Sequence, residues 1–143
     1  MVALTADRNT PEATGVEREG LLGAAQTIFI GSILMRNAAG QLIKGATALG
    51  SVGVGRAEKR GTSVAAGVTS QRYRSGVYRF ANSTAGDLIV TADIGAACFI
   101  VDDQTVAKTN GTATRSPAGI IDGVDALGVW VRFDEALTRA WLS

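Results

Sequence analysis

The stretch GVWVRFD, at residues 128–134, has the plainest structural pattern in the chain. Its valines and its phenylalanine fall on one face of an extended strand, while Trp130 and Arg132 fall on the other, because neighbouring side chains in a strand point to opposite faces. The pattern predicts a strand over residues 128–133 with an apolar inner face and with Trp130 on the outside.

Two turns predict β-hairpins. The turn DALG, at residues 125–128, joins this strand to the apolar run GIID at residues 119–122. The turn NAAG, at residues 37–40, joins the apolar run that ends at Met35 to QLIK at residues 41–44.

The chain from residue 27 onward consists of short apolar or alternating runs separated by small residues, with 18 glycines and only 2 prolines in the whole sequence. This spacing predicts an all-β fold, either a β-sandwich or a jelly roll. Residues 27–35 are apolar on both faces, which suits a central strand or a buried helix, and their β-branched members favour the strand. Further strands are predicted at Ser51–Lys59, Ser70–Phe80, Ala97–Val101, Thr105–Thr109 and Ala118–Asp122.

The predicted strand at residues 70–80 contains a conflict. Arg72 and Arg74 fall on the same face as Tyr78 and Phe80, which does not suit a half-buried strand. A change of register at Ser75-Gly76 removes the conflict, and glycine is typical of such bulges.

The ends of the chain differ from its middle, which predicts three parts. Residues 1–20 are polar and aperiodic and predict an extended N-terminal arm. Residues 21–133 predict the β-rich domain. Within it, the sequence of residues 81–95 is compatible with a long loop containing one helical turn and leaves the form of this segment open. Residues 134–143 predict a C-terminal tail, either a short helix that places Leu137 and Trp141 four positions apart or an extended segment.

The composition favours a protein that is partly covered by a partner. Charged residues make up 19% of the 143 residues, against about 25% in ordinary domains. The net charge of +1 creates no field that would attract nucleic acid or anionic lipid. We expect neither a signal peptide nor a membrane span, since no long apolar stretch is present.

Catalysis is not expected, because the chain contains no histidine and therefore no common triad or general base. The three lysines, Lys44, Lys59 and Lys108, lack a serine at the spacing of a Ser-Lys dyad. The only cysteine, Cys98, lies in an apolar run and predicts a small buried side chain. We therefore predict a protein that is not an enzyme and has no cofactor.

Two motifs resemble ligand sites without completing them. The stretch GSVGVGRA, at residues 50–57, has the glycine spacing of a phosphate-binding loop but lacks its lysine and its hydroxyl residue. We predict a glycine-rich strand there. Asp102 and Asp103 follow a strand without the spacing of a calcium loop, so we predict a turn and no metal site.

The stretch RYRSGVYRF, at residues 72–80, interleaves basic and aromatic residues, as strands that bind single-stranded nucleic acid do. A nucleic-acid-binding β-barrel is therefore the alternative function. A protein interface is favoured, since arginine, tyrosine and tryptophan are enriched at interfaces and no second basic cluster is present. The predicted interface residues are Leu4, Arg8, Pro11, Arg72, Tyr73, Arg74, Tyr78, Arg79, Trp130, Arg132 and Trp141.

The order of several motifs resembles small proteins encoded beside the major capsid protein of tailed phages, which are regarded as capsid decoration or cement proteins. The resemblance spans residues 4 to about 133, and residues 138–143 lie beyond it. It is carried by LTADRNTP at residues 4–11, GVGRAE at 53–58, SGVYRFAN at 75–82, CFIVDDQTVA at 98–107, AGII at 118–121 and GVWV at 128–131.

This resemblance implies a structural virion protein that binds the outer surface of a phage capsid and cements neighbouring major capsid protein subunits. It implies a β-rich fold such as a jelly roll, and a homo-oligomer, with a dimer slightly favoured over a trimer. The chain would then be made in the host bacterial cytoplasm and be located on the virion. No catalytic or cofactor-binding residues come with the family.

Overall fold

The computed structural model describes residues 2–13 and 15–142 of the chain. It is mostly β, with 41% strand and 9% helix, and this confirms the predicted all-β fold class. The strands are β1 (Glu17–Leu21), β2 (Thr27–Ile28), β3 (Ile33–Arg36), β4 (Leu42–Lys44), β5 (Val52–Ala57), β6 (Gly61–Thr62), β7 (Ser70–Arg74), β8 (Gly76–Phe80), β9 (Ala97–Ile100), β10 (Val106–Ala107), β11 (Pro117–Asp125) and β12 (Gly128–Phe133). The helices are α1 (Glu135–Trp141) and two single 3-10 turns, Ala85–Asp87 and Thr91–Asp93.

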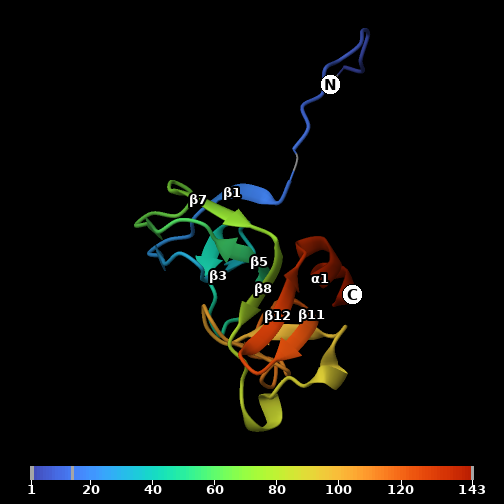
Figure 1. Ribbon diagram of the computed structural model, residues 1–143. Coiled ribbons are helices and arrows are strands. Elements are labelled where there is room, and N and C mark those ends of the chain that lie inside the picture. Colours follow the sequence, from blue (N-terminus) through green and yellow to red (C-terminus); the bar gives the residue numbers. More distant parts are fainter. Residues whose placement is uncertain (1, 14, 143) are drawn as a thin grey trace.

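Two five-stranded antiparallel sheets form the body of the molecule in a sandwich-like arrangement. The first sheet has the order β1-β7-β5-β3-β4 and the second has the order β10-β9-β11-β12-β8, while β2 and β6 pair separately. Figure 1 shows the first sheet above the second, with α1 at one side and the N-terminal arm leading away from the body.

The main core lies between the two sheets. Ile33 and Met35 of β3 join buried residues of the second sheet, such as Val129 and Val131, and all four are fully buried. The sheets approach so closely that Gly53 of β5 lies directly against the backbone of β11. A second, smaller core fills the other face of the first sheet, so β3 is buried on both sides.

Single bridges join the outer strands of each sheet. Leu22, just after β1, forms a parallel bridge with Leu42 of β4. Ala81, just after β8, forms a parallel bridge with Thr105, just before β10. Each five-stranded sheet is therefore curved until its two edges meet.

The strand predicted from the alternating stretch is confirmed as β12, from Gly128 to Phe133. Val129 and Val131 point into the core and are fully buried, whereas Trp130 is 37% exposed. Both predicted hairpins are present, as β11 with β12 and as β3 with β4. The observed β11 begins at Pro117 and continues to Asp125, beyond the predicted end at residue 122, with an irregularity between Ile121 and Gly123.

The prediction of one strand over residues 27–35 was wrong. The run divides into β2 and β3, and Phe29 and Ile30 between them are 52% and 65% exposed. Ser32 closes a tight turn, because its hydroxyl and its N–H both donate to the Phe29 carbonyl, at 2.8 and 3.2 Å. Gly31 has a φ of 88°, a conformation that glycine adopts without strain.

At Ser75-Gly76, where a change of register was predicted, the strand ends and the chain crosses from one sheet to the other. β7 ends at Arg74 in the first sheet, and β8 begins at Gly76 in the second. Gly76 has a φ of 131°, which permits the chain to cross between the sheets. Arg74 and Tyr78 therefore belong to different sheets.

Other predicted boundaries shift by a few residues. The strands predicted at 51–59 and 97–101 are shorter, and the one at 105–109 shrinks to Val106–Ala107, since the N–H of Lys108 donates to Asp87 in a loop. Residues 81–95 form a loop with two 3-10 turns instead of one.

The structure corrects the predicted boundary of the N-terminal arm and decides between the two alternatives for the C-terminal tail. The arm was predicted to reach residue 20, but residues 17–21 pair with β7 as β1, so the extended arm ends earlier. The tail forms the helical alternative, α1, whose first turn is capped by the Asp134 carboxylate accepting from the Leu137 N–H. Among the described residues, no helix is both long enough and apolar enough to cross a membrane.

Candidate interaction surface

The outer face of the second sheet carries a fixed tryptophan. Trp130 of β12 lies opposite Arg79 of β8, whose guanidinium carbon is 5.3 Å from the centroid of the indole ring. The indole Nε1–H donates to Asp125 Oδ2 at 2.8 Å, and Arg79 Nη1 lies 3.6 Å from the same oxygen. A cation over an indole ring is favourable, so both ring face and ring edge are held.

The hairpin turn places Asp125 for this role. Its Oδ1 accepts the N–H groups of Leu127 and Gly128 at 2.8 and 3.0 Å, which leaves Oδ2 free for Trp130. The hydrogen bond from Trp130, followed by those from the turn, lowers the pKa of Asp125 below its usual value of 3.8. Trp130 is therefore oriented before any partner binds, which reduces the entropy lost on binding.

Two more predicted interface residues sit near this tryptophan. Arg132 shares the outer face of β12 with Trp130 and lies opposite Val77, which is 40% exposed. Its guanidinium is 3.9 Å from the Asp134 carboxylate, in an exposed ion pair. The structure thus brings Arg79, Trp130 and Arg132 together on one face.

A second group of predicted residues lies on the first sheet. Arg74 of β7 is directly opposite Arg56 of β5, so both side chains point to one face. Arg56 binds Glu58 at 2.7 Å and lies 4.2 Å above the ring of Tyr78. Sequence reasoning missed Arg56, because its glycine-rich surroundings suggested only a strand.

Tyr73 does not belong to the surface, which corrects its prediction as an interface residue. It is only 7% exposed and packs in the smaller core, since it alternates with the outward Arg72 and Arg74. Its hydroxyl accepts from Arg36 Nη2 at 3.0 Å, and Arg36 Nε donates to Glu135 of α1 at 3.1 Å. Partial burial, the largest single effect, lowers the pKa of Arg36, but the hydrogen bonds and charge interactions with Glu135 and Tyr73 together outweigh it, and the pKa is raised.

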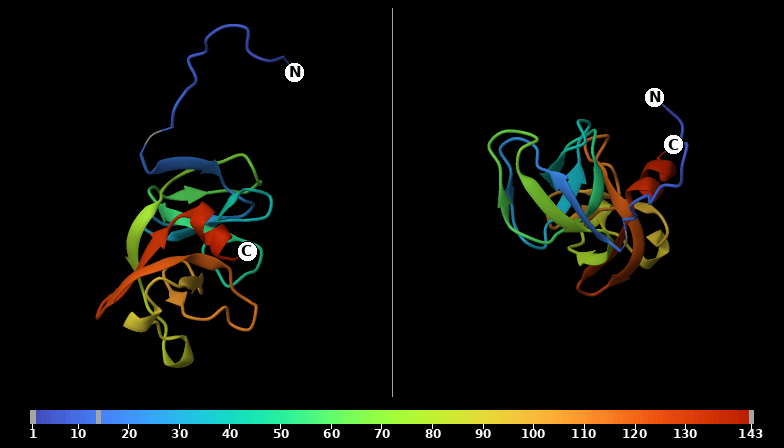
Figure 2. Two further views of the ribbon diagram at one scale, coloured as in Figure 1. Left: turned by 90° about the vertical axis from the view of Figure 1, so that its right-hand side faces the viewer. Right: turned by 90° about the horizontal axis from the view of Figure 1, so that it is seen from above.

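The remaining predicted residues lie apart from both groups. Leu4, Arg8 and Pro11 are exposed in the arm, which Figure 2 shows leading away from the sheets. Arg72 is exposed and lies 4.0 Å from Glu17, and Trp141 is 49% exposed on α1.

An apolar loop between β6 and β7 was not anticipated. Residues 64–68, with the sequence VAAGV, are all exposed, and Val64 and Val68 are 91% and 73% exposed. The loop is fixed at both ends, since Ala25 N–H donates to the Val64 carbonyl and Gly67 N–H donates to the Leu22 carbonyl. The available signal was the absence of any charged residue between Arg60 and Arg72. Because most residues of this stretch are small, it was not recognised as an apolar surface.

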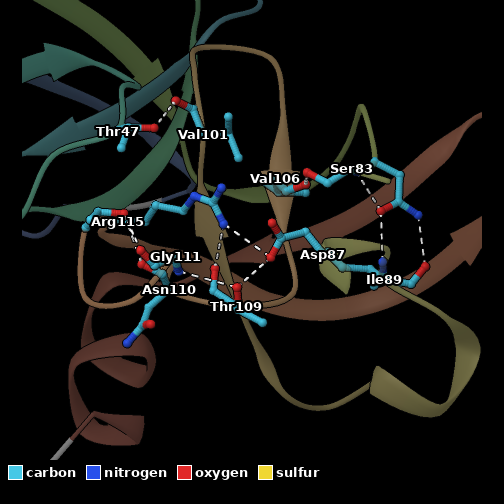
Figure 3. Close-up of polar contacts among 12 residues, drawn as sticks. Thr47, Ser83, Asp87, Ile89, Val101, Val106, Thr109, Asn110, Gly111 and Arg115 are labelled. Atoms are coloured by element: carbon cyan, nitrogen blue, oxygen red, sulfur yellow. Dashed lines mark hydrogen bonds and ion pairs between the residues drawn. The ribbon is translucent and has the colours of Figure 1, made fainter. Parts of the chain in front are cut away.

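A second apolar loop lies at the far end of the molecule, where Leu88, Val90 and Ile94 are 41 to 46% exposed around the buried Ile89. The Asn82 side chain binds both the N–H and the carbonyl of Ile89, at 3.0 and 2.9 Å. Figure 3 shows this contact and the neighbouring network in which Asp87 receives Thr109 and Arg115. These polar contacts fix the backbone of the loop at Ile89 and Asp87, while the neighbouring apolar side chains remain exposed.

The motifs that resembled ligand sites form ordinary structure. Residues 52–57 form β5, with Val52 and Val54 buried, and the Asp102 carboxylate accepts from the Gln104 N–H in a turn. In the described part of the chain, acidic residues and Cys98 form no cluster able to hold a metal. Cys98 is fully buried, as predicted, and burial raises the pKa of its thiol to about 12.

Comparisons of the chain with protein-family models, with curated proteins and with solved structures found no match.

Proposed function

We propose that this chain is a structural virion protein that binds the outside of a phage capsid and cements neighbouring major capsid protein subunits. The sequence resemblance to decoration proteins supports the capsid as the partner. The distribution of exposed side chains supports a binding role.

The observation that carries the binding role is the set of apolar side chains held on the outside of the β-domain. Trp130 is fixed by Arg79 and Asp125, and Val64 and Val68 stand on a loop fixed by backbone hydrogen bonds. Tryptophan and arginine are typical of the residues that dominate binding energy at interfaces. Fixed side chains also lose little conformational entropy when a partner covers them.

Such surfaces suit attachment to a repeated lattice. The apolar loops lie toward opposite ends of the molecule and differ in sequence, so one copy has more than one place to make contact. Several weak contacts give high avidity when made together. Binding only to the assembled shell stabilises that shell by mass action.

The alternative, a single-strand nucleic-acid-binding β-barrel, receives less support. Tyr73 is buried, and Arg56 covers the ring of Tyr78, so neither ring is open to stack on a base. Arg74 and Arg79 also lie on different sheets.

The test is binding to capsids that lack this protein. We expect the wild-type chain to co-sediment with such shells and to raise the temperature at which they break apart. Trp130→Ala and the Val64→Ser/Val68→Ser double variant should bind more weakly, each by about tenfold or more if these side chains act as interface anchors.

Lys44→Ala is the matched control, since Lys44 is exposed and its side chain has no partner in the described structure. It should bind like the wild type. Failure of the wild-type chain to bind shells, together with its absence from purified virions by mass spectrometry, would reject the proposed function.

A further inference from the structure

The most unusual charge in the molecule belongs to Arg74. Its guanidinium makes no hydrogen bond and no ion pair with the described residues, and its Nε is buried from solvent without a partner. Buried donors are nearly always paired, because leaving one unpaired costs free energy. An acceptor that is missing from the single chain would complete this site.

The neighbours of Arg74 make the binding of an anion at its guanidinium more favourable. Arg56 lies directly opposite across β5 and β7, and like charges opposite each other repel. Arg56 already has Glu58 as its acid partner, whereas Glu17, opposite Arg74 on β1, lies 4.0 Å from Arg72 instead. The site is therefore a half-buried guanidinium, flanked by a second one, that is open to a carboxylate.

The N-terminal arm offers carboxylates without partners. Asp7 and Glu12 are exposed, and neither has a hydrogen bond or an ion pair in the described structure. With Arg8 as the only base, residues 2–13 carry a net charge of +1 − 2 = −1, counted from the sequence. Leu4 is 74% exposed, so the described part of the arm carries acidic side chains without partners and an apolar side chain that is not buried.

The attached end of the arm, where the chain enters β1, lies beside Arg74. The Ser75 N–H donates to the Val16 carbonyl at 3.1 Å, and Glu17 pairs with Arg74. From there the arm leads away from its own domain (Figures 1 and 2). Fully extended, residues 2–13 span about 40 Å at roughly 3.3 Å per residue, which is enough to reach a second copy.

We infer that two copies of this chain exchange their N-terminal arms, and that Asp7 or Glu12 of one arm binds Arg74 of the other copy. The attached end of each arm lies next to Arg74 of its own copy. A two-fold axis near β1 and β7 therefore brings each arm close to Arg74 of the other copy, so that both sites are filled at once. This inference concerns the free protein and does not depend on the capsid.

The test is the oligomeric state of full-length chains, measured by sedimentation velocity over a wide range of concentration. We expect a wild-type dimer that dissociates as salt is added, because salt screens ion pairs. Arg74→Met and the Asp7→Asn/Glu12→Gln variant should each weaken dimerisation by about tenfold or more. Glu17→Gln is the matched control and should dimerise like the wild type.

A charge exchange makes the test specific. Arg74→Glu alone and Asp7→Arg/Glu12→Arg alone should both be monomeric, since arm and site then carry like charges. Mixed together, these two variants should form a heterodimer, because each arm meets a site of opposite charge. Recovery in the mixture cannot come from misfolded chains.

Three results would overturn the inference: a wild-type chain that stays monomeric, a dimer unaffected by the arm variants, or variants that do not pair when mixed. An arm that binds Arg74 of its own chain would give the first result. Dimers that exchange arms but do not bind shells would reject the proposed function alone, and shell binding by arm-independent monomers would reject this inference alone.

Discussion

The two faces of β12 differ in environment, although their residues alternate along one strand. On the inner face, Val129 and Val131 are completely buried and Phe133 is 2% exposed. On the outer face, Trp130 remains 37% exposed although it is bound by Arg79 and Asp125. The inner face stabilises the fold and the outer face is free for a partner, so stability and binding should respond to different substitutions on one strand.

The largest expected effect is on the inner face. Phe133→Ala should lower the free energy of unfolding by about 3–5 kcal/mol, because it removes a buried ring and leaves a cavity. Phe133 packs edge-to-face on Phe80, with ring centroids 5.8 Å apart. Denaturant unfolding monitored by circular dichroism measures the change.

Arg132→Ala, one position away on the outer face, is the control for Phe133→Ala. It should change the free energy of unfolding by less than about 0.5 kcal/mol, as exposed positions generally do. Similar losses for the two variants would contradict the division between the faces.

The next effect concerns the contact between the sheets. A Cβ added at Gly53 would lie 2.2 Å from the Ala118 carbonyl oxygen, which is backbone and cannot rotate away. Gly53→Ala should therefore force the sheets apart and cost about 1–3 kcal/mol of unfolding free energy. Gly86→Ala is its control, since nothing lies within 4 Å of the added atom, and thermal unfolding of both variants provides the comparison.

A smaller effect is expected at the outer face itself. Trp130→Ala should lower the free energy of unfolding by less than about 1 kcal/mol, the usual scale of an exposed cation–π contact. Differential scanning calorimetry measures this change. A loss as large as that of Phe133→Ala would show that Trp130 supports the fold and would remove it from the candidate surface.

The smallest effect is a pH response confined to the outer face. The pKa of Asp125 is lowered below 3.8, so its bond to Trp130 contributes above that pH and is lost as the pH falls through the folded-state pKa. In a Trp141→Phe background, Trp130 fluorescence should change with a midpoint below pH 3.8. Asp125→Asn should abolish the transition, and a midpoint above the usual carboxylate pKa would contradict the assignment.

The sequence predicted best where side-chain alternation was complete. β12 was predicted at its observed bounds because every second residue of the stretch is apolar. The run at residues 27–35 misled, since its apolar residues include Phe29 and Ile30, which the structure leaves exposed around the turn at Gly31. An apolar residue in a turn gives the same pattern as one in a core.

The candidate surface was predictable only in part. Arg79, Trp130 and Arg132 follow from strand alternation, but their meeting on one face depends on the pairing of β8 with β12, which lies far along the chain. Tyr73 was wrongly assigned to the surface because the strand's inner and outer faces were not distinguished before Ser75. That Arg74 has no partner among the described residues depends on its three-dimensional neighbours and leaves no trace in the sequence.

The bridges that join the outer strands of each sheet also limit how copies can assemble. An open sheet edge invites another chain to add a strand, and repeated addition produces fibres. Leu22 with Leu42, and Ala81 with Thr105, occupy the edges where such growth would begin. Strand addition at these two edges is therefore disfavoured, and we expect copies of this protein to associate through side chains or through the arm and not by growth from sheet to sheet.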